Sequence, residues 1–123
     1  MTTGFDAHVR LIDEVAVIDL IGEINNLAGD RLEAAYSEVH RNDKPVVLLN
    51  FKDVEYINSS GIALIVTLLA RARSDDRAVL SCNLSDHYNE IFVITRVTDF
   101  MTVYPDESSA LAGSRPDGAP QRR

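Results

Sequence analysis

Two adjacent serines, Ser59 and Ser60, have the clearest capacity for chemistry in this chain. They precede Gly61 and the apolar segment 62–66, where a run of helix formers begins. Backbone N–H groups in the first turn of a helix lack partners within the helix, and the helix dipole is positive there. A serine hydroxyl at such a point can cap the helix, and a phosphate there gains backbone donors. The segment therefore predicts either a capping serine or a serine that accepts a phosphoryl group.

The residue types alone favour capping, because Ser and Asn are among the most common residues at helix starts. The position in the chain favours function. The pattern places the serines after a buried strand, and functional sites collect at the carboxyl ends of parallel strands. Gly61 leaves room beside the serines for a partner to approach the backbone.

The elements before this segment begin with a predicted hairpin. Apolar and polar residues alternate over residues 5–11, which is typical of a half-buried strand. Residues 15–21 are nearly continuous apolar with a single Asp19, which predicts a more buried strand that ends at Gly22. Residues 23–26 form a polar loop, and helical spacing of apolar residues over 27–41 predicts a helix.

The rest of the chain alternates strands with helices. We expect a central strand at 46–51, a connection at 53–58, a helix at 59–74, a strand at 78–82, a helix at 85–95 capped by Ser85, and a short strand at 101–104. Pro105 opens a last helical segment to residue 112. The fold class is therefore α/β. We expect one domain over residues 1–112, with a mixed four- to five-stranded sheet, an N-terminal hairpin and about four helices. Residues 113–123 are expected to be disordered.

Composition narrows the range of partners. The chain has 123 residues and a formal net charge of −7, which argues against nucleic acid and anionic membranes as partners. The N-terminus lacks the pattern of a signal peptide, so a cytoplasmic location is expected. Cys82 is the single cysteine and lies in an apolar run, where it is expected to pack rather than react. Neither a metal nor another cofactor is expected, because His8, His40 and His87 lie on separate elements without ligand spacing.

Two short motifs resemble the STAS domain family, which includes the anti-anti-sigma factors of bacteria. The segment from Asn58 to Ile62, after the strand 46–51 and the residues 54–57, resembles the family's phosphorylation segment, Asp-Ser-Ser/Thr-Gly followed by an apolar helix. The segment from Gly22 to Asn25 resembles the family's Gly-Glu-apolar-Asp loop. The resemblance extends over residues 5–111 and includes the order of the elements.

The resemblance implies a phosphorylation switch. It makes Ser60 the phosphoacceptor and implies a partner that is both anti-sigma factor and serine kinase, with an ATPase domain of the histidine-kinase type. The unphosphorylated protein would bind this partner and free a sigma factor, and a phosphatase would reset the phosphorylated form. The sequence departs from the family at two aspartates, which are Asn25 and Asn58 here. Slower phosphorylation, or a different kinase, is the expected consequence.

The predicted docking surface surrounds Ser60. Leu64 and Val66 lie off the core stripe of their helix, so they are either buried against a neighbouring helix or part of an exposed apolar patch. We expect the segment 62–66 to overlap the docking site. The predicted partner-binding residues are Glu23, Asn25, Asn58, Ser59, Gly61, Ile62, Leu64 and Val66.

Two alternative functions stay open at this point. The chain could be a scaffold subunit of a stressosome-like assembly of STAS domains, which predicts a large oligomer. It could also use the Ser59–Ser60 segment for enzyme chemistry or to hold a small molecule, although no Gly-x-Ser-x-Gly elbow and no glycine-rich phosphate loop is present. The preferred hypothesis is a non-enzymatic binding module that is a monomer or a weak homodimer.

Overall fold

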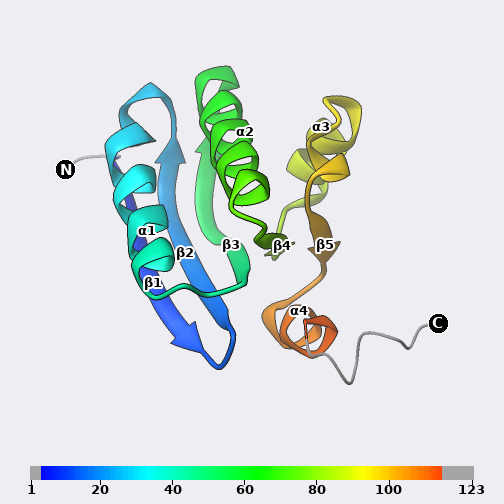
Figure 1. Ribbon diagram of the computed structural model, residues 1–123. Helices are drawn as coiled ribbons and strands as arrows, with labels where there is room; N and C mark the ends of the chain where they lie inside the picture. Colours follow the sequence, from blue (N-terminus) through cyan, green and yellow to red (C-terminus); the bar gives the residue numbers. More distant parts are fainter. Residues whose placement is uncertain (1–3, 115–123) are drawn as a thin grey trace.

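The computed structural model describes residues 4–114, which form a sheet with helices on both faces (Figure 1). The strands are β1 (Phe5–Ile12), β2 (Val15–Ile24), β3 (Val46–Ile57), β4 (Ala78–Cys82) and β5 (Thr102–Tyr104). The helices are α1 (Gly29–Arg41), α2 (Ser59–Ser74), α3 (Asp86–Ile94) and α4 (Glu107–Gly113), with 3₁₀ turns η1 (Asn26–Ala28) and η2 (Val97–Asp99). The predicted class is confirmed: the five-stranded sheet is mixed, and four α-helices accompany it.

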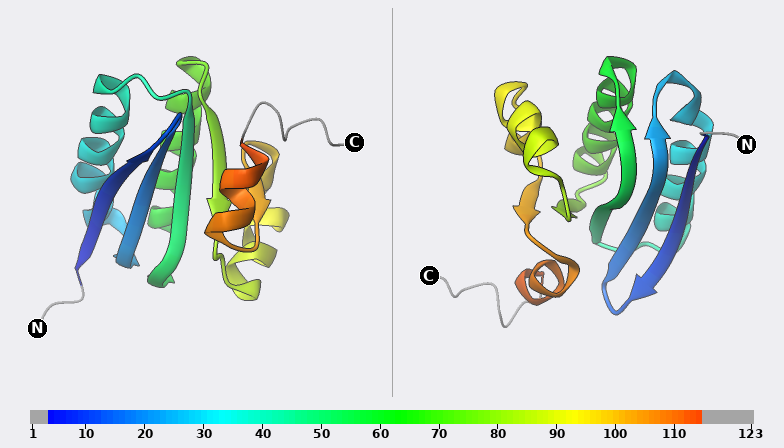
Figure 2. Two further views of the ribbon diagram at one scale, coloured as in Figure 1. Left: turned by 90° about the horizontal axis from the view of Figure 1, so that it is seen from below. Right: turned by 180° about the vertical axis from the view of Figure 1, so that it is seen from behind.

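The strands lie in the sheet in their order along the chain, β1 to β5. The β1–β2 hairpin is antiparallel, and each later neighbouring pair is parallel. Each parallel pair is joined by a crossover, so the helices α1, α2 and α3 all return over the same face. Figure 2 shows α4 on the opposite face of the sheet. The carboxyl ends of β2 and β3 consequently lie side by side, which brings together the starts of the segments that follow them.

Each face of the sheet has its own apolar core. The larger core lies under α1, α2 and α3 and includes Ile18, Leu49, Ile65 and Phe92, all nearly inaccessible to solvent. The smaller core lies under α4 and includes Cys82 and Ala110 among its buried residues. The continuous apolar pattern of residues 46–49 thus arises because β3 is covered on both faces, as its sequence predicts.

Two strands are longer than their patterns predict. Gly22 does not end β2, which runs on to Ile24, and the expected connection at 53–58 is mostly strand, because β3 continues to Ile57. The two extensions pair with each other in parallel register, Glu23 with Tyr56 and Ile24 with Ile57. A register shift lies between Gly22 and Glu23, and Gly22 has a φ of 93°, a conformation that glycine adopts without strain. The acidic residues Asp53 and Glu55 are accommodated in this strand because a strand turns alternate side chains toward solvent.

The smaller differences concern helix ends. The predicted helix at 27–41 divides into η1 and α1, and the last helix begins at Glu107, not at Pro105, because the side chain of Asp106 caps it by accepting from the amide of Ser109 at 2.8 Å. Ser85 caps α3 as predicted, accepting from the amide of Tyr88. Helix α4 includes Gly113, and the expected disordered tail otherwise lies, from residue 115 on, outside the described residues.

A polar network crosses the sheet on the α4 side. The guanidinium of Arg10 on β1 donates to both carboxylate oxygens of Asp19 on β2, at 2.6 and 2.9 Å, and to Glu107 on α4 at 2.6 Å. Asp19 also accepts from the amide of Asn50 on β3 at 2.9 Å. The hydrogen bonds from Arg10 lower the pKa of Asp19 from its ordinary value, the bond from Asn50 adds to the effect, and partial burial opposes it. The charged form of Asp19 therefore stabilises the folded chain.

Gly61 joins the start of α2 to the end of β2. A Cβ atom at position 61 would lie 1.9 Å from the carbonyl oxygen of Ile24, closer than any real contact allows. The same carbonyl accepts a hydrogen bond from the amide of Asn58 at 3.2 Å. The first turn of α2 thus rests directly on the backbone of β2, and only glycine permits this approach.

Replacing Asp19 with asparagine should reduce the sensitivity of this protein to acid. Because the pKa of Asp19 is lowered in the folded state, its contribution to stability is present above the unfolded value of about 3.9 and is lost as the pH falls through the lower, folded value. Asp19→Asn should therefore lower the free energy of unfolding at neutral pH and flatten its decline below about pH 4. Denaturant titrations at a series of pH values measure both. Asp53→Asn, an exposed carboxylate outside the network, is the control. An unchanged acid limb in Asp19→Asn would contradict the assignment.

Gly61→Ala should destabilise the domain by roughly 1–3 kcal/mol, because the added methyl group forces α2 away from the carbonyl of Ile24. Thermal and denaturant unfolding measure the loss. Ala63→Gly is an informative comparison, since position 63 is exposed on the same helix and its substitution should cost about 1 kcal/mol through helix propensity alone. A Gly61→Ala variant as stable as the parent would show that the close approach is not needed.

Candidate functional site

Ser60 stands at the second residue of α2, and its side chain is exposed to solvent. Ser59, also exposed, precedes it as the first residue of the helix. The amides of both serines have no hydrogen-bond acceptor among residues 4–114. The position therefore combines an accessible hydroxyl with free backbone donors at the positive end of a helix.

The helix cap is Asn58 and not a serine. Its side-chain oxygen accepts from the amide of Gly61 at 2.9 Å, and its backbone is extended. Capping is thus satisfied without Ser59 or Ser60, so capping does not account for the two hydroxyls. Asn25 acts in the same way at the end of β2, where its side-chain oxygen accepts from the amide of Leu27 at 2.9 Å.

The two departures from the family motif consequently preserve local structure. Asparagine and aspartate are comparable N-caps. What the chain lacks at Asn25 and Asn58 is a pair of negative charges close to Ser60. The substitutions change the electrostatics of the site while the backbone geometry is supported by the same kind of hydrogen bond.

The predicted site residues at the ends of β2 and β3 do lie together. Glu23 is half-buried and pairs with Tyr56 across the two strands, so the end of β2 adjoins the segment that leads to Ser60. The amide of Asn58 binds the carbonyl of Ile24, and Gly61 packs on the same carbonyl. The structure therefore gathers one cluster, which we call the serine face: Glu23, Asn25, Asn58, Ser59, Ser60 and Gly61.

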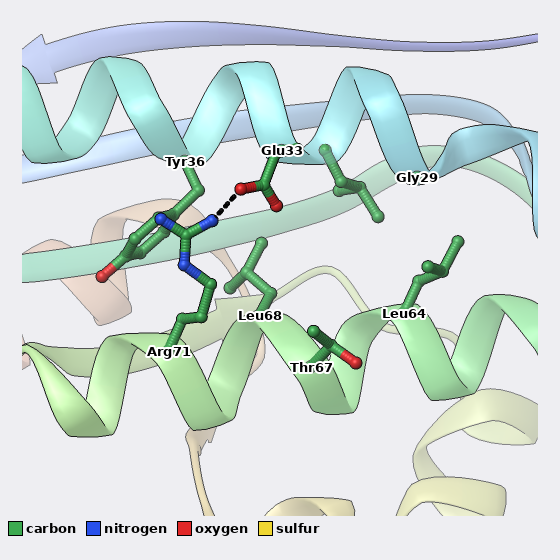
Figure 3. A pocket seen from close by; sticks show the side chains of 8 residues that line it. Gly29, Glu33, Tyr36, Leu64, Thr67, Leu68 and Arg71 are labelled. Atoms are coloured by element: carbon green, nitrogen blue, oxygen red, sulfur yellow. Dashed lines mark hydrogen bonds and ion pairs between the residues drawn. The ribbon is translucent and has the colours of Figure 1, made fainter.

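A narrow crevice lies between α1 and α2 (Figure 3). Leu64 borders it and lies opposite Gly29, where a Cβ atom would come within 3.5 Å of the leucine side chain. An ion pair between Arg71 and Glu33 bridges the two helices over the crevice, and the guanidinium of Arg71 lies 4.6 Å from the ring centre of Tyr36. The enclosed volume is about 40 Å³, which is room for about one water molecule.

Val66 lies apart from this cluster. It is 42% exposed and borders a different groove, shared with Phe100 on the far side of α2. Ile62 and Leu64 are half-buried and pack against the main core. The segment 62–66 is therefore not one continuous patch, because successive residues of a helix point in directions about 100° apart. Of the two alternatives for these residues, packing against neighbouring elements holds for Leu64, and exposure to solvent holds for Val66.

Leu27 belongs beside the serine face, although its sequence pattern did not single it out as a site residue. Its side chain is 82% exposed, and η1, which contains it, contacts α2. The helical spacing of the neighbouring apolar residues could have identified Leu27 as exposed. Ala28 at the end of η1 and Leu32 on α1 are buried four residues apart, which leaves Leu27 off this stripe and facing solvent. An exposed leucine at this position adds apolar area to a docking surface.

The described residues were also considered for a reactive thiol, a metal site and a membrane-spanning helix. Burial, aided by nearby carboxylates, raises the pKa of Cys82 to about 11, so its thiol is unreactive at neutral pH. Among residues 4–114 no group of three or more His, Cys, Asp or Glu side chains is arranged to hold a metal ion. Of the helices in that range, none is long and apolar enough to cross a membrane.

Known proteins share both sequence and fold with this chain. BtrV of Bordetella bronchiseptica, a protein named for a proposed role as an anti-sigma factor antagonist, is 25% identical over 104 residues, which are 84% of this chain and 86% of BtrV. The anti-sigma-B factor antagonist of Staphylococcus aureus is 24% identical over 91 residues, which are 74% of this chain and 84% of that protein.

The fold also agrees with that of a solved structure. The Bacillus cell fate determinant SpoIIAA in its phosphorylated form superimposes with a TM-score of 0.69 at 20% sequence identity, covering 89% of this chain and 99% of that chain. The sequence model of the STAS domain matches residues 6–110, which include the five strands except Phe5 at the start of β1, and the whole serine face. This chain belongs to the STAS domain family.

Proposed function

We propose that this protein is an anti-sigma factor antagonist that binds its anti-sigma factor through the serine face and is switched off by phosphorylation of Ser60. The observation that carries the proposal is the exposed hydroxyl of Ser60 at the start of α2, beside a cap that Asn58 already provides. The names of the sequence relatives support the regulatory class. The binding partner is a serine kinase with a histidine-kinase-type ATPase domain, and a phosphatase restores the active form.

A phosphate on Ser60 fits the local structure. The free amides of Ser59 and Ser60 and the helix dipole stabilise negative charge at this point. The modification adds about −1.5 to −2 charges at neutral pH. Because the hydroxyl is already exposed, the phosphate needs no change in the fold, and its effect is confined to the surface that the partner contacts.

Phosphorylation then weakens docking by charge and by bulk. Glu23 lies on the serine face, and Asp53 and Glu55 are exposed on the adjoining part of β3. The unmodified face is already acidic on this side, so a phosphate concentrates negative charge where an apolar contact, offered by Leu27 and Ile62, must form. A partner that fits a serine hydroxyl loses shape complementarity with a phosphoserine in the same place.

Phosphorylation of Ser60 is tested with candidate partners. We expect a histidine-kinase-type anti-sigma ATPase from the same genome, incubated with this protein and ATP, to add the mass of one phosphate. Ser60→Ala should remove the modification and still bind the ATPase, whereas Ser60→Asp should weaken binding by about tenfold or more. Intact-protein mass spectrometry and calorimetry measure the two effects.

Ser59→Ala is the matched control, since it removes the neighbouring hydroxyl from the same turn. It should keep the phosphate and bind normally. Modification that persists in Ser60→Ala would move the switch to another residue. Failure of the unmodified protein to bind any ATPase of this type would overturn the function itself. Turnover or ligand retention by the protein alone would favour the enzyme or carrier alternative.

The charges missing at Asn25 and Asn58 should limit the rate of phosphorylation. Asn58→Asp restores a carboxylate two residues before Ser60 while keeping the cap, so the melting temperature should change little. If the carboxylate orients the hydroxyl or receives its proton, the rate with the partner kinase should rise by about tenfold or more. Single-turnover phosphorylation measures this rate. Asn42→Asp, at the far end of α1, is the control. Equal phosphorylation rates in the parent protein, Asn58→Asp and Asn42→Asp would contradict the proposed role of the carboxylate.

A further inference from the structure

A groove along the outer side of α2 has almost entirely apolar walls. Its volume is about 320 Å³, and its lining residues are Val66, Leu69, Ala70, Arg73, Ser74 and Phe100. This volume lies at the lower end of the range of roughly 300–1,000 Å³ that small-molecule sites occupy. Figure 1 shows α1 on one side of α2 and β5, which follows Phe100, on the other. The groove is therefore separate from the crevice between α1 and α2.

Arg73 brings an uncompensated positive charge to this groove. Val66, Ala70 and Arg73 are exposed and follow one another at helical spacing, so the arginine stands at one end of the apolar wall. The guanidinium lies 5.6 Å from the ring centre of Phe100, within the range of a cation–π contact. Within residues 4–114, Arg73 forms no ion pair and donates no side-chain hydrogen bond. Its planar set of N–H donors is available to an anion.

A second, more polar groove meets the first at the same arginine. It has a volume of about 380 Å³, shares Arg73 and Phe100 with the apolar groove, and is also lined by β4, Thr98 and Thr102. Asp99 lines it too, but this carboxylate accepts a hydrogen bond from the guanidinium of Arg96 at 2.7 Å. Arg73 thus stands where an apolar and a polar groove adjoin, and the acidic residue on this side is already paired.

We propose that these grooves bind an anionic amphiphile, a molecule with one apolar chain that ends in a carboxylate. The chain lies along Val66 and Ala70, and the carboxylate pairs with Arg73. Burial of the chain supplies affinity, and the charge-assisted hydrogen bonds determine which way round the ligand lies. The ligand is a free molecule and not a membrane lipid, because the net charge of −7 opposes approach to an anionic bilayer.

A small ligand fits this place better than a protein does. The groove extends along α2 from residue 66 to residue 74, a rise of roughly 12 Å. A stable protein interface takes about 20–30 residues on each side, many more than the few that line this groove. The groove also begins six residues after Ser60 and does not include the serine face. The proposed ligand site is therefore independent of the proposed phosphorylation.

The probe is decanoate below its micelle concentration, added to the full chain labelled with ¹⁵N. We expect saturable binding, with amide shift changes in the nuclear magnetic resonance spectrum centred on residues 66–74 and 98–102. Octanoate should bind several-fold more weakly, because each buried CH₂ group adds to affinity. Decyltrimethylammonium has a chain of the same length and the opposite charge, and it should bind about tenfold more weakly or worse.

Substitutions test the two parts of the site separately. Arg73→Gln should weaken decanoate binding by about tenfold, whereas Arg41→Gln, exposed at the end of α1, should leave it unchanged. Ala70→Leu should fill the apolar groove and weaken binding by about tenfold or more. Ala63→Leu, exposed on the same helix outside the groove, is its matched control. Circular dichroism and thermal melting verify that each variant is folded.

Several outcomes would overturn the proposal. These are the absence of saturable decanoate binding, equal binding of the two head-group charges, binding that ignores Arg73→Gln, and shift changes centred away from the groove. Binding to vesicles of phosphatidylglycerol without binding of free decanoate would assign the surface to a membrane and would overturn the proposal as well.

Discussion

The contact between Gly61 and the carbonyl of Ile24 determines how the functional end of this domain is arranged. Without a side chain at position 61, the first turn of α2 rests against the backbone of β2. The carbonyl that Gly61 approaches also accepts the amide of Asn58, so one backbone atom fixes the last residue before the helix and the third residue within it. The exposed hydroxyl of Ser60 lies between these two points. The position of Ser60 is therefore set by backbone contacts on both sides of it and not by a flexible loop.

The same contact explains why two distant segments form one face. The β2 and β3 extensions pair up to Ile24 and Ile57, and each is followed at once by an asparagine that caps the next helical turn. Because both strands end at the same level, Asn25 and Asn58 begin their turns side by side. A binding surface built in this way can change its chemistry by single substitutions, such as amide for carboxylate, while its shape stays the same.

The element order, the central strand and the exposed position of Ser60 could be predicted from sequence, because each depends on local periodicity or on a motif. The extensions of β2 and β3 could not. Residues 53–56 carry two acidic side chains and look like a loop, and only pairing with β2 makes them a strand. The sequence pattern also did not predict that Leu64 and Val66 lie on different surfaces. Both lie off the core stripe, and only the position of α1 decides that one is packed and the other exposed.

Helix α2 presents side chains to three different surfaces. Ile65, Leu68, Leu69 and Ala72 hold it on the sheet, Leu64 and Arg71 face α1, and Val66 with Arg73 faces outward beside Phe100. The core stripe fixes the rotation of the helix about its axis, so the directions of the other two surfaces follow from it. A helix held in this way can carry a modified residue at its start without moving its outer groove. The fold thus places the proposed phosphorylation site and this apolar groove on one element, separated along the helix and by rotation about its axis.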